Sequence, residues 1–144
     1  MAEFRIERRS ALSPDDAWRR LTQWERHAAH VPLTRITVVT RGPNGLGTRF
    51  VARTGIGPAG FDDPMEVVRW EPPEPGHPGF CELEKQGTVV LGRAGIEVRP
   101  EGRGCRVVWH EEMRIARLPA AFDGLTAQSG RLLFGRAVAG LLRG

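Results

Sequence analysis

Residues 118–142 read LPAAFDGLTAQSGRLLFGRAVAGLL, and this stretch decides the fold that we expect. Its large apolar side chains recur at the spacing of an α-helix, which predicts one long C-terminal helix with an apolar face. That face is expected to hold Leu118, Phe122, Leu125, Leu132 and Leu133, with Leu141 and Leu142 closing the helix.

The residues before this helix alternate between apolar and polar side chains, which is typical of β-strands. Turn-forming residues interrupt the alternation, notably Pro43-Asn44-Gly45 and the proline-rich residues 72–79. We expect strands over 3–9, 34–40, 48–54, 61–70, 80–86, 88–99 and 105–116.

Ser13-Pro14-Asp15-Asp16 marks the start of a helical region that stops before Pro32. The Ser13 hydroxyl can cap the free amides, Pro14 fits the first helical position, and the acids favour the positive end of the helix dipole. Residues 14–30 are therefore expected to form two short helical pieces between the first and second strands.

This order of elements predicts one α+β domain over residues 1–144. Successive hairpins make the seven-stranded sheet antiparallel, and the C-terminal helix alone is long enough to cover its apolar face. The sheet must therefore curve and wrap around that helix.

The net charge of +4 comes from 21 basic and 17 acidic residues, and the basic residues are arginines except for Lys85. The arginines are spread along the chain with no basic block, so we expect no nucleic-acid partner. No apolar run approaches the length of a membrane span, and the N-terminus carries acids and arginines where a signal peptide is apolar. These features favour a cytoplasmic location.

Four stretches, taken with the order of elements, resemble the START-like helix-grip superfamily (SRPBCC), and more closely its bacterial polyketide cyclase/dehydrase-like group. They are Ser13-Pro14-Asp15-Asp16-Ala17-Trp18, residues 61–67 (FDDPMEV) with Trp70-Glu71-Pro72, Val107-Val108-Trp109-His110-Glu111-Glu112, and Leu132-Leu133-Phe134-Gly135-Arg136. The resemblance covers essentially the whole chain. It implies an apolar pocket between sheet and helix, in a superfamily that includes ligand carriers, receptors, cyclases, co-chaperones and lipid-transfer proteins.

The strand order of that superfamily also bears on the two cysteines. It pairs the first strand with the seventh and puts the fifth two strands away from the seventh. Cys81 and Cys105 would then lie at least about 9 Å apart, beyond the reach of a disulfide, so we predict two free thiols.

Glu111 is the candidate catalytic residue, because the inner face of strand 105–116 places it alone among apolar side chains. A carboxylate in such a setting has a raised pKa, which suits general acid/base chemistry on a ketone or enol. The alternative is a structural ion pair, with Arg8 on the neighbouring strand as the expected partner.

Asp63 is a second candidate catalytic residue, on a strand face that points toward the cavity mouth; the alternative is that it accepts hydrogen bonds from loop amides beside Pro64. Trp109 is the strongest candidate lining residue, and Gly92 and Ala94 are small enough to leave space for the helix or a ligand. The full set of expected ligand-binding residues is Trp109, Met113, Phe50, Met65, Gly92, Ala94, Phe122, Leu125 and Ser129.

Several other patterns point away from cofactor chemistry. Gly55-Ile56-Gly57-Pro58-Ala59-Gly60 fits a dinucleotide motif in letters, but a strand rather than a helix follows it. It is expected to be a flexible hairpin loop, and the resemblance to the superfamily implies that this loop lies at the pocket mouth. His27 and His30 lack a third metal ligand, and Lys85 lies at a strand end beside a turn, so we expect no cofactor, no metal and no covalent catalysis.

The leading hypothesis is a binding protein for a small hydrophobic or aromatic molecule, acting as carrier, sequestering protein or sensor, and either monomeric or homodimeric. The enzyme alternative is a polyketide cyclase/dehydrase that uses Glu111. A third possibility is a protein-interaction module. A cavity of a few hundred Å³ with Glu111 unpaired would favour the enzyme. A cavity of that size with Glu111 in an ion pair would favour the carrier. A filled interior with an apolar surface patch would favour the interaction module.

Overall fold

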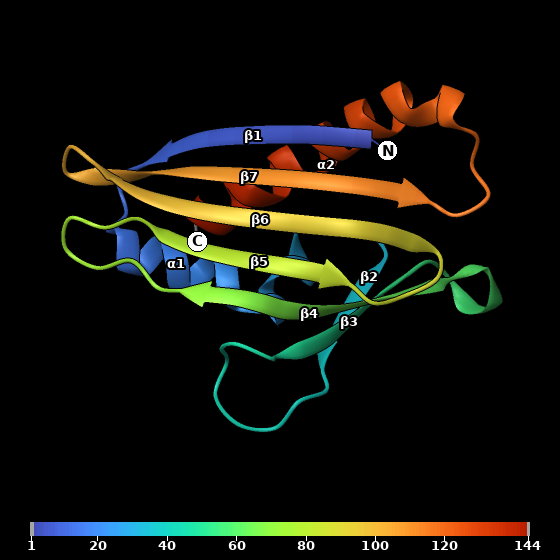
Figure 1. Cartoon of the computed structure of the whole chain (residues 1–144), viewed down its shortest axis with the longest axis horizontal. Coiled ribbons are helices and arrows are strands. Elements are labelled where there is room, and N and C mark those ends of the chain that lie inside the picture. Colours follow the sequence, from blue (N-terminus) through green and yellow to red (C-terminus); the bar gives the residue numbers. More distant parts are fainter. Residues whose placement is uncertain (1, 144) are drawn as a thin grey trace.

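A computed structural model describes residues 2–143, which form one antiparallel sheet of seven strands with helices against its inner side (Figure 1). The strand order is β1-β7-β6-β5-β4-β3-β2, so each hairpin neighbour in sequence is a neighbour in the sheet and β1 closes onto β7. The strands are β1 (Ala2–Ser10), β2 (Thr34–Val38), β3 (Arg49–Thr54), β4 (Phe61–Glu71), β5 (Gly79–Lys85), β6 (Val90–Glu101) and β7 (Gly104–Ile115). The predicted α+β helix-grip fold is confirmed.

The region between β1 and β2 folds into two short pieces, as predicted: α1 (Pro14–Thr22) and the 3-10 helix η1 (Trp24–Ala29). The Ser13 side chain accepts a hydrogen bond from the Asp16 amide at 3.1 Å, which confirms the predicted cap. Asn44, in the loop between β2 and β3, ties this region to the sheet. Its amide oxygen accepts from Trp24 Nε1 at 3.0 Å, and its nitrogen donates to the Thr22 carbonyl at 2.6 Å.

The long helix α2 (Asp123–Arg143) packs chiefly against β1, with further contacts to α1 and η1. Its second half is buried, whereas its first turns extend past β1 at the upper right of Figure 1. Two further 3-10 turns complete the chain, η2 (Gly57–Ala59) and η3 (Ala120–Phe122). No helix within residues 2–143 is long and apolar enough to cross a membrane.

The predicted apolar face of α2 is wrong. Leu125 and Leu132 are 61% and 59% exposed, and Phe122 is also exposed. The buried positions are instead mostly small, because glycines allow close approach: a Cβ at Gly130 would lie 2.5 Å from the Phe4 ring. The buried residues of α2 are Gly130, Gly135, Ala137, Val138, Gly140, Leu141 and Leu142.

Alternate residues of the central strands form the core on the concave face, among them Val67, Leu83, Ile96, Val107 and Trp109. A register shift in β4 between Val67 and Arg69 changes the alternation. Trp70 thereby packs edge-on against Trp18 of α1, with ring centroids 5.1 Å apart.

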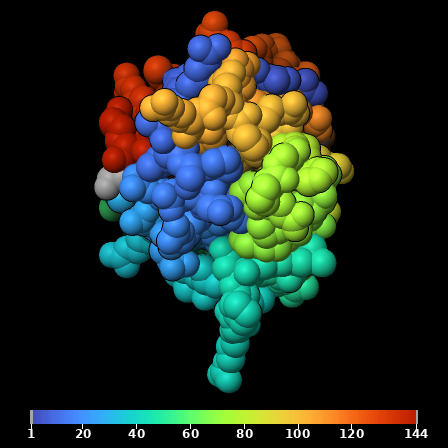
Figure 2. Space-filling view, turned by 90° about the vertical axis from the view of Figure 1, so that its left-hand side faces the viewer, coloured from blue at the N-terminus to red at the C-terminus, as the bar shows by residue number. Residues whose placement is uncertain are grey.

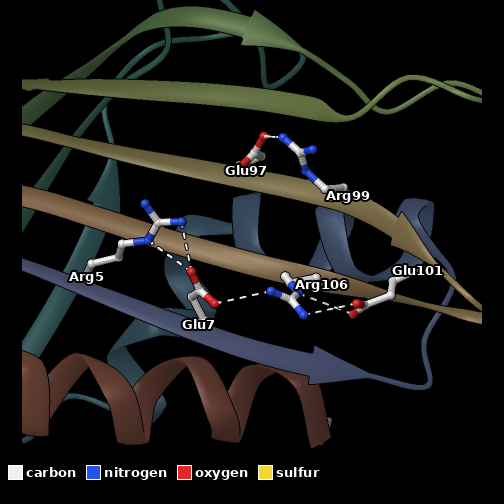
Figure 3. A network of polar contacts seen from close by, with 6 residues as sticks. All are labelled: Arg5, Glu7, Glu97, Arg99, Glu101 and Arg106. Carbon is white, nitrogen blue, oxygen red and sulfur yellow. Dashed lines mark hydrogen bonds and ion pairs between the residues drawn. The ribbon is translucent and has the colours of Figure 1, made fainter.

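The convex face of the sheet carries ion pairs rather than apolar side chains (Figure 3). Arg106 contacts both Glu7 and Glu101, and Glu7 also pairs with Arg5 at 2.8 Å. Exposed pairs of this kind stabilise a fold by at most about 1 kcal/mol each, so the core on the other face determines stability.

Cys81 and Cys105 are both buried and unpaired, which confirms the prediction of two free thiols. Burial raises the pKa of Cys81 to about 12, so this thiol is unreactive at neutral pH.

Candidate functional site

An interior pocket of about 90 Å³ lies between the middle of the sheet, η1 and α2. This volume is much smaller than the few hundred Å³ that a drug-sized ligand site occupies. Its lining residues are Trp24, His27, Val31, Thr34, Ile36, Phe50, Ala52, Thr54, Asp63, Met65, Leu83, Lys85, Ala94, Trp109, Glu111 and Phe134.

Two stacked aromatic pairs form walls of this pocket. Trp24 stacks on Phe50 with centroids 4.8 Å apart, and Trp109 stacks on Phe134 at 5.6 Å. His27 contacts both tryptophan rings, and its Nε2–H donates a hydrogen bond to the Leu21 carbonyl at 2.7 Å. Burial lowers the pKa of His27, so the imidazole is neutral at pH 7 and forms part of the apolar wall.

A buried cluster of three charged side chains forms the polar side of the pocket. Lys85 Nζ lies 2.9 Å from Asp63 Oδ2 and 3.4 Å from Glu111 Oε1. The side chains of Lys85 and Glu111 are only 4% and 2% exposed. We call Asp63, Lys85 and Glu111 the buried charge cluster.

The sheet register explains how residues so distant in sequence meet. Glu111 of β7 pairs with Ala94 of β6, which in turn pairs with Leu83 of β5. Because two strand spacings separate β5 from β7, about 10 Å must be crossed, and the small Ala94 lets the long Lys85 side chain cross that distance. Asp63 reaches the same point from β4, where its neighbour Met65 pairs with Lys85.

Burial and neighbouring charges act in opposite directions on Lys85 and Glu111. Burial alone would lower the pKa of Lys85, but attraction to Glu111 and Asp63 outweighs it and raises the pKa above its usual value. Burial raises the pKa of Glu111, and the Lys85 ammonium only partly opposes this. Lys85 is therefore a stable cation, whereas Glu111 binds a proton more tightly than an exposed glutamate does.

Three buried polar atoms around the pocket have no hydrogen-bond partner among the described residues: Asp63 Oδ1, Glu111 Oε2 and Trp109 Nε1. The Trp109 indole is near enough to favour the ionised form of Glu111, but the two groups do not meet hydrogen-bond geometry. Buried polar groups are almost always paired in folded proteins, so these atoms indicate a place for bound water or a polar ligand group.

The structure divides the predicted site residues into two groups. Glu111, Asp63, Trp109, Phe50, Met65 and Ala94 line the interior pocket. Met113, Phe122, Leu125 and Ser129 instead line an open apolar groove of about 360 Å³ between the end of β7, the segment after it and the first half of α2. Because the first turns of α2 do not cover the sheet, these four residues are at the surface and only Phe134 borders both spaces.

Three expectations about individual residues are wrong. Glu111 pairs with Lys85 and not with Arg8, whose guanidinium donates to the Glu7 carbonyl at 2.9 Å. Asp63 pairs with Lys85 rather than with loop amides beside Pro64. Gly92 lines neither the interior pocket nor the groove, and it is glycine because its φ is 128° and a Cβ there would clash with the Glu112 carbonyl oxygen.

Sequence reasoning missed several lining residues, among them Trp24, His27 and Phe134, and Lys85 matters most because it carries the charge. Its place at the end of a strand suggested exposure. A signal was present, since Leu83 and Lys85 share the inner face of their strand, and a lone lysine in an arginine-rich chain is unusual. The sequence alone does not indicate that the Lys85 ammonium group reaches Glu111, two strands away in the sheet.

This architecture, a curved antiparallel sheet against a long C-terminal helix with an aromatic-walled interior pocket, defines the helix-grip class of ligand-binding folds. The sequence matches the family described as "Polyketide cyclase / dehydrase and lipid transport" over residues 1–143, and the chain belongs to that family. The predicted superfamily is thereby confirmed. The search of curated protein sequences returned no match.

Solved structures show the same fold at low sequence identity. TTHA0849 from Thermus thermophilus is 20% identical with a TM-score of 0.69, covering 98% of this chain and 92% of that chain. A norcoclaurine synthase point mutant from Thalictrum flavum, in complex with a transition state analogue, is 17% identical with a TM-score of 0.62, covering 97% and 92%. StfQ, a di-domain ARO/CYC from the steffimycin biosynthetic pathway, is 17% identical with a TM-score of 0.64, covering 99% of this chain and 48% of that chain.

Proposed function

We propose that the protein binds a small molecule whose apolar or aromatic body fills the interior pocket and whose polar group meets the buried charge cluster. The observation that carries this proposal is the set of three unpartnered buried polar atoms beside two aromatic stacks. A cluster that served stability alone would be fully hydrogen-bonded, since each unpaired buried group costs about 1–3 kcal/mol.

The pocket volume limits the size of the molecule. About 90 Å³ has room for roughly three water molecules, and an engineered cavity of about 150 Å³ is known to hold benzene. The pocket as it stands is therefore large enough for a short branched chain. A single ring or a larger molecule requires Phe134 to move, because this side chain borders both the pocket and the apolar groove.

The donor and acceptor pattern defines the polar group. Trp109 Nε1 can only donate a hydrogen bond, and Asp63 Oδ1 accepts one. Glu111 Oε2 accepts when ionised and donates when protonated. A group that both accepts and donates, such as a phenol, a carboxamide or an enol, fits this set.

A proton-transfer reaction is the second candidate function, and the raised pKa of Glu111 supports it. A carboxyl group whose pKa moves toward neutrality can give a proton to, and take one from, an enol or ketone in the pocket. The Lys85 ammonium group would stabilise the negative charge that develops on the substrate. As a protonated amine it is not a nucleophile, so this candidate involves no covalent intermediate.

Ligand-observed NMR with a panel of single-ring phenols, benzamides and cyclic ketones tests the proposal. We expect at least one class to bind the wild-type protein and to lose affinity at least tenfold in Ile36→Phe, which adds volume at the β2 wall of the pocket, two strands away from Asp63 of the buried charge cluster. Glu84→Gln on the exposed side of β5 is the matched control for Glu111→Gln. Binding that persists in Ile36→Phe would place the ligand elsewhere and overturn the proposal.

The two candidate functions separate by a second measurement on the same panel. If the protein catalyses proton transfer, deuterium from solvent exchanges into the α-position of a bound ketone, and Glu111→Gln slows the exchange by about 100-fold or more. Binding without exchange favours the carrier or sensor role.

A further inference from the structure

The C-terminal segment is basic. Residues 114–143 contain five arginines and a single acid, Asp123, so this segment carries a formal net charge of +4. A local excess of positive charge attracts anionic partners.

Arginines beside α2 lack the acidic partners that arginines on the convex face of the sheet have. On the convex face, Arg5, Arg99 and Arg106 each pair with a glutamate (Figure 3). A groove of about 440 Å³ between α2 and β1 holds Arg8, Arg131, Arg136 and Arg143, and no acid of the described chain lines it. None of these four forms an ion pair within residues 2–143.

Apolar side chains are exposed on the same element. Leu125 and Leu132 are 61% and 59% exposed, and Leu118 and Phe122 just before α2 are 37% and 46% exposed. Leu125, Leu132, Arg136 and Arg143 are separated by seven, four and seven residues, so they follow one stripe along α2. The stripe is apolar toward its start and basic toward its end. We call it the α2 stripe.

We propose that the α2 stripe and the arginine groove beside it dock the protein on an anionic lipid surface. Arginine guanidinium groups bind phosphate in a bidentate manner, and leucine and phenylalanine side chains enter the boundary of the acyl chains. A second copy of this chain is a poor occupant, because it would bring like charges together. Nucleic acid would satisfy the arginines but would leave the exposed leucines in water. This proposal does not depend on the interior pocket.

Sedimentation with vesicles tests it. The purified chain is mixed, at about 0.05 M salt, with vesicles of phosphatidylcholine alone or with about 30% phosphatidylglycerol added. We expect binding only to the anionic vesicles, and release when salt is raised to about 0.5 M, where charges are screened within a few ångströms. Absence of binding to anionic vesicles at low salt would overturn the proposal.

Three double variants sharpen the test. Arg131→Gln/Arg136→Gln should weaken vesicle binding about thirty-fold, and Leu125→Ser/Leu132→Ser at least tenfold. Arg35→Gln/Arg41→Gln removes the same charge from exposed positions on and after β2 and should bind like the wild-type protein. All these side chains are exposed, so circular dichroism should confirm unchanged folding.

Two results would contradict docking on lipid. The Arg35→Gln/Arg41→Gln control could lose as much affinity as Arg131→Gln/Arg136→Gln, which would show that only net charge matters. Alternatively, a single-stranded oligonucleotide could bind tightly at about 0.15 M salt and depend on Arg131 and Arg136 while Leu125→Ser/Leu132→Ser leaves vesicle binding unchanged. That result would assign the surface to nucleic acid.

Discussion

Lys85 is the residue on which the buried charge cluster depends, because it is the cation between two carboxylates. Replacing it by methionine keeps the apolar stem and leaves Asp63 and Glu111 buried without a counter-charge. We expect Lys85→Met to lower the free energy of unfolding by about 3–5 kcal/mol, measured by urea denaturation. The triple variant Lys85→Met/Asp63→Asn/Glu111→Gln should recover part of this loss. A Lys85→Met protein as stable as wild type would show that the pair is not formed in solution.

Glu111 gives the protein a pH dependence of definite sign. Its pKa is raised in the folded state, so the folded state holds the proton more tightly than the unfolded state. The stabilisation is complete below the unfolded pKa of about 4.3 and disappears as pH rises through the folded pKa. Unfolding curves between pH 4 and 8 should therefore show wild type losing stability relative to Glu111→Gln as pH rises. A difference that changes in the opposite direction would mean that the pKa is lowered.

At the scale of elements, the helix α2 shows which local features the sequence revealed and which it did not. Its existence, its C-terminal end and the N-cap of α1 followed from spacing and residue type, whereas its start lies at Asp123 and not at the expected Leu118. The buried face of α2 could not be predicted, because apolar residues occur on several sides of this helix. Which side is buried depends on how closely β1 approaches. Gly130 allows that approach and Gly140 allows the approach of His30, although helix propensity identifies both only as weak helix formers.

A pair of glycine variants tests this account of α2. Gly130→Ala should destabilise the protein by about 1–3 kcal/mol despite the higher helix propensity of alanine, because the new Cβ meets the Phe4 ring. Gly124→Ala in the first turn meets nothing within 4 Å and should stabilise by up to about 1 kcal/mol. Thermal unfolding followed by circular dichroism measures both. Equal effects of the two substitutions would mean that α2 does not lie against β1 at Gly130.

At the scale of the whole molecule, both cysteines act as reporters of global opening. Cys81 and Cys105 lie in the core, and burial raises the pKa of both thiols. We expect a thiol-specific reagent to modify neither cysteine in native buffer on the timescale in which both react in denaturant. Rapid modification of one thiol in native buffer would reveal local opening of β5 or β7.

The fold as a whole could be predicted from the sequence because each strand, turn and cap agrees with the same topology. The candidate site could be predicted only in part. Trp109 and Glu111 were found because alternation in one strand fixes which way they point. The partner of Glu111 depends on where the long Lys85 side chain ends. The separation of the pocket from the groove depends on where α2 begins to cover the sheet. Neither feature produces a periodic pattern in the sequence.

The hydrogen bonds of Asn44 have a consequence for how this scaffold tolerates change. The loop between β2 and β3 extends below the sheet in Figure 1 and forms the teal projection at the bottom of Figure 2. Only its Asn44 fastens Trp24, an aromatic wall of the pocket, while Leu46 near the tip is 71% exposed. The amide of the next residue, Gly47, donates to the carbonyl of the buried Val67 at 2.8 Å, so the backbone of this loop should not be lengthened there. A fluorescent label or surface linker attached to the side chain at position 46 should leave the interior undisturbed, which makes this position suitable for immobilising the protein.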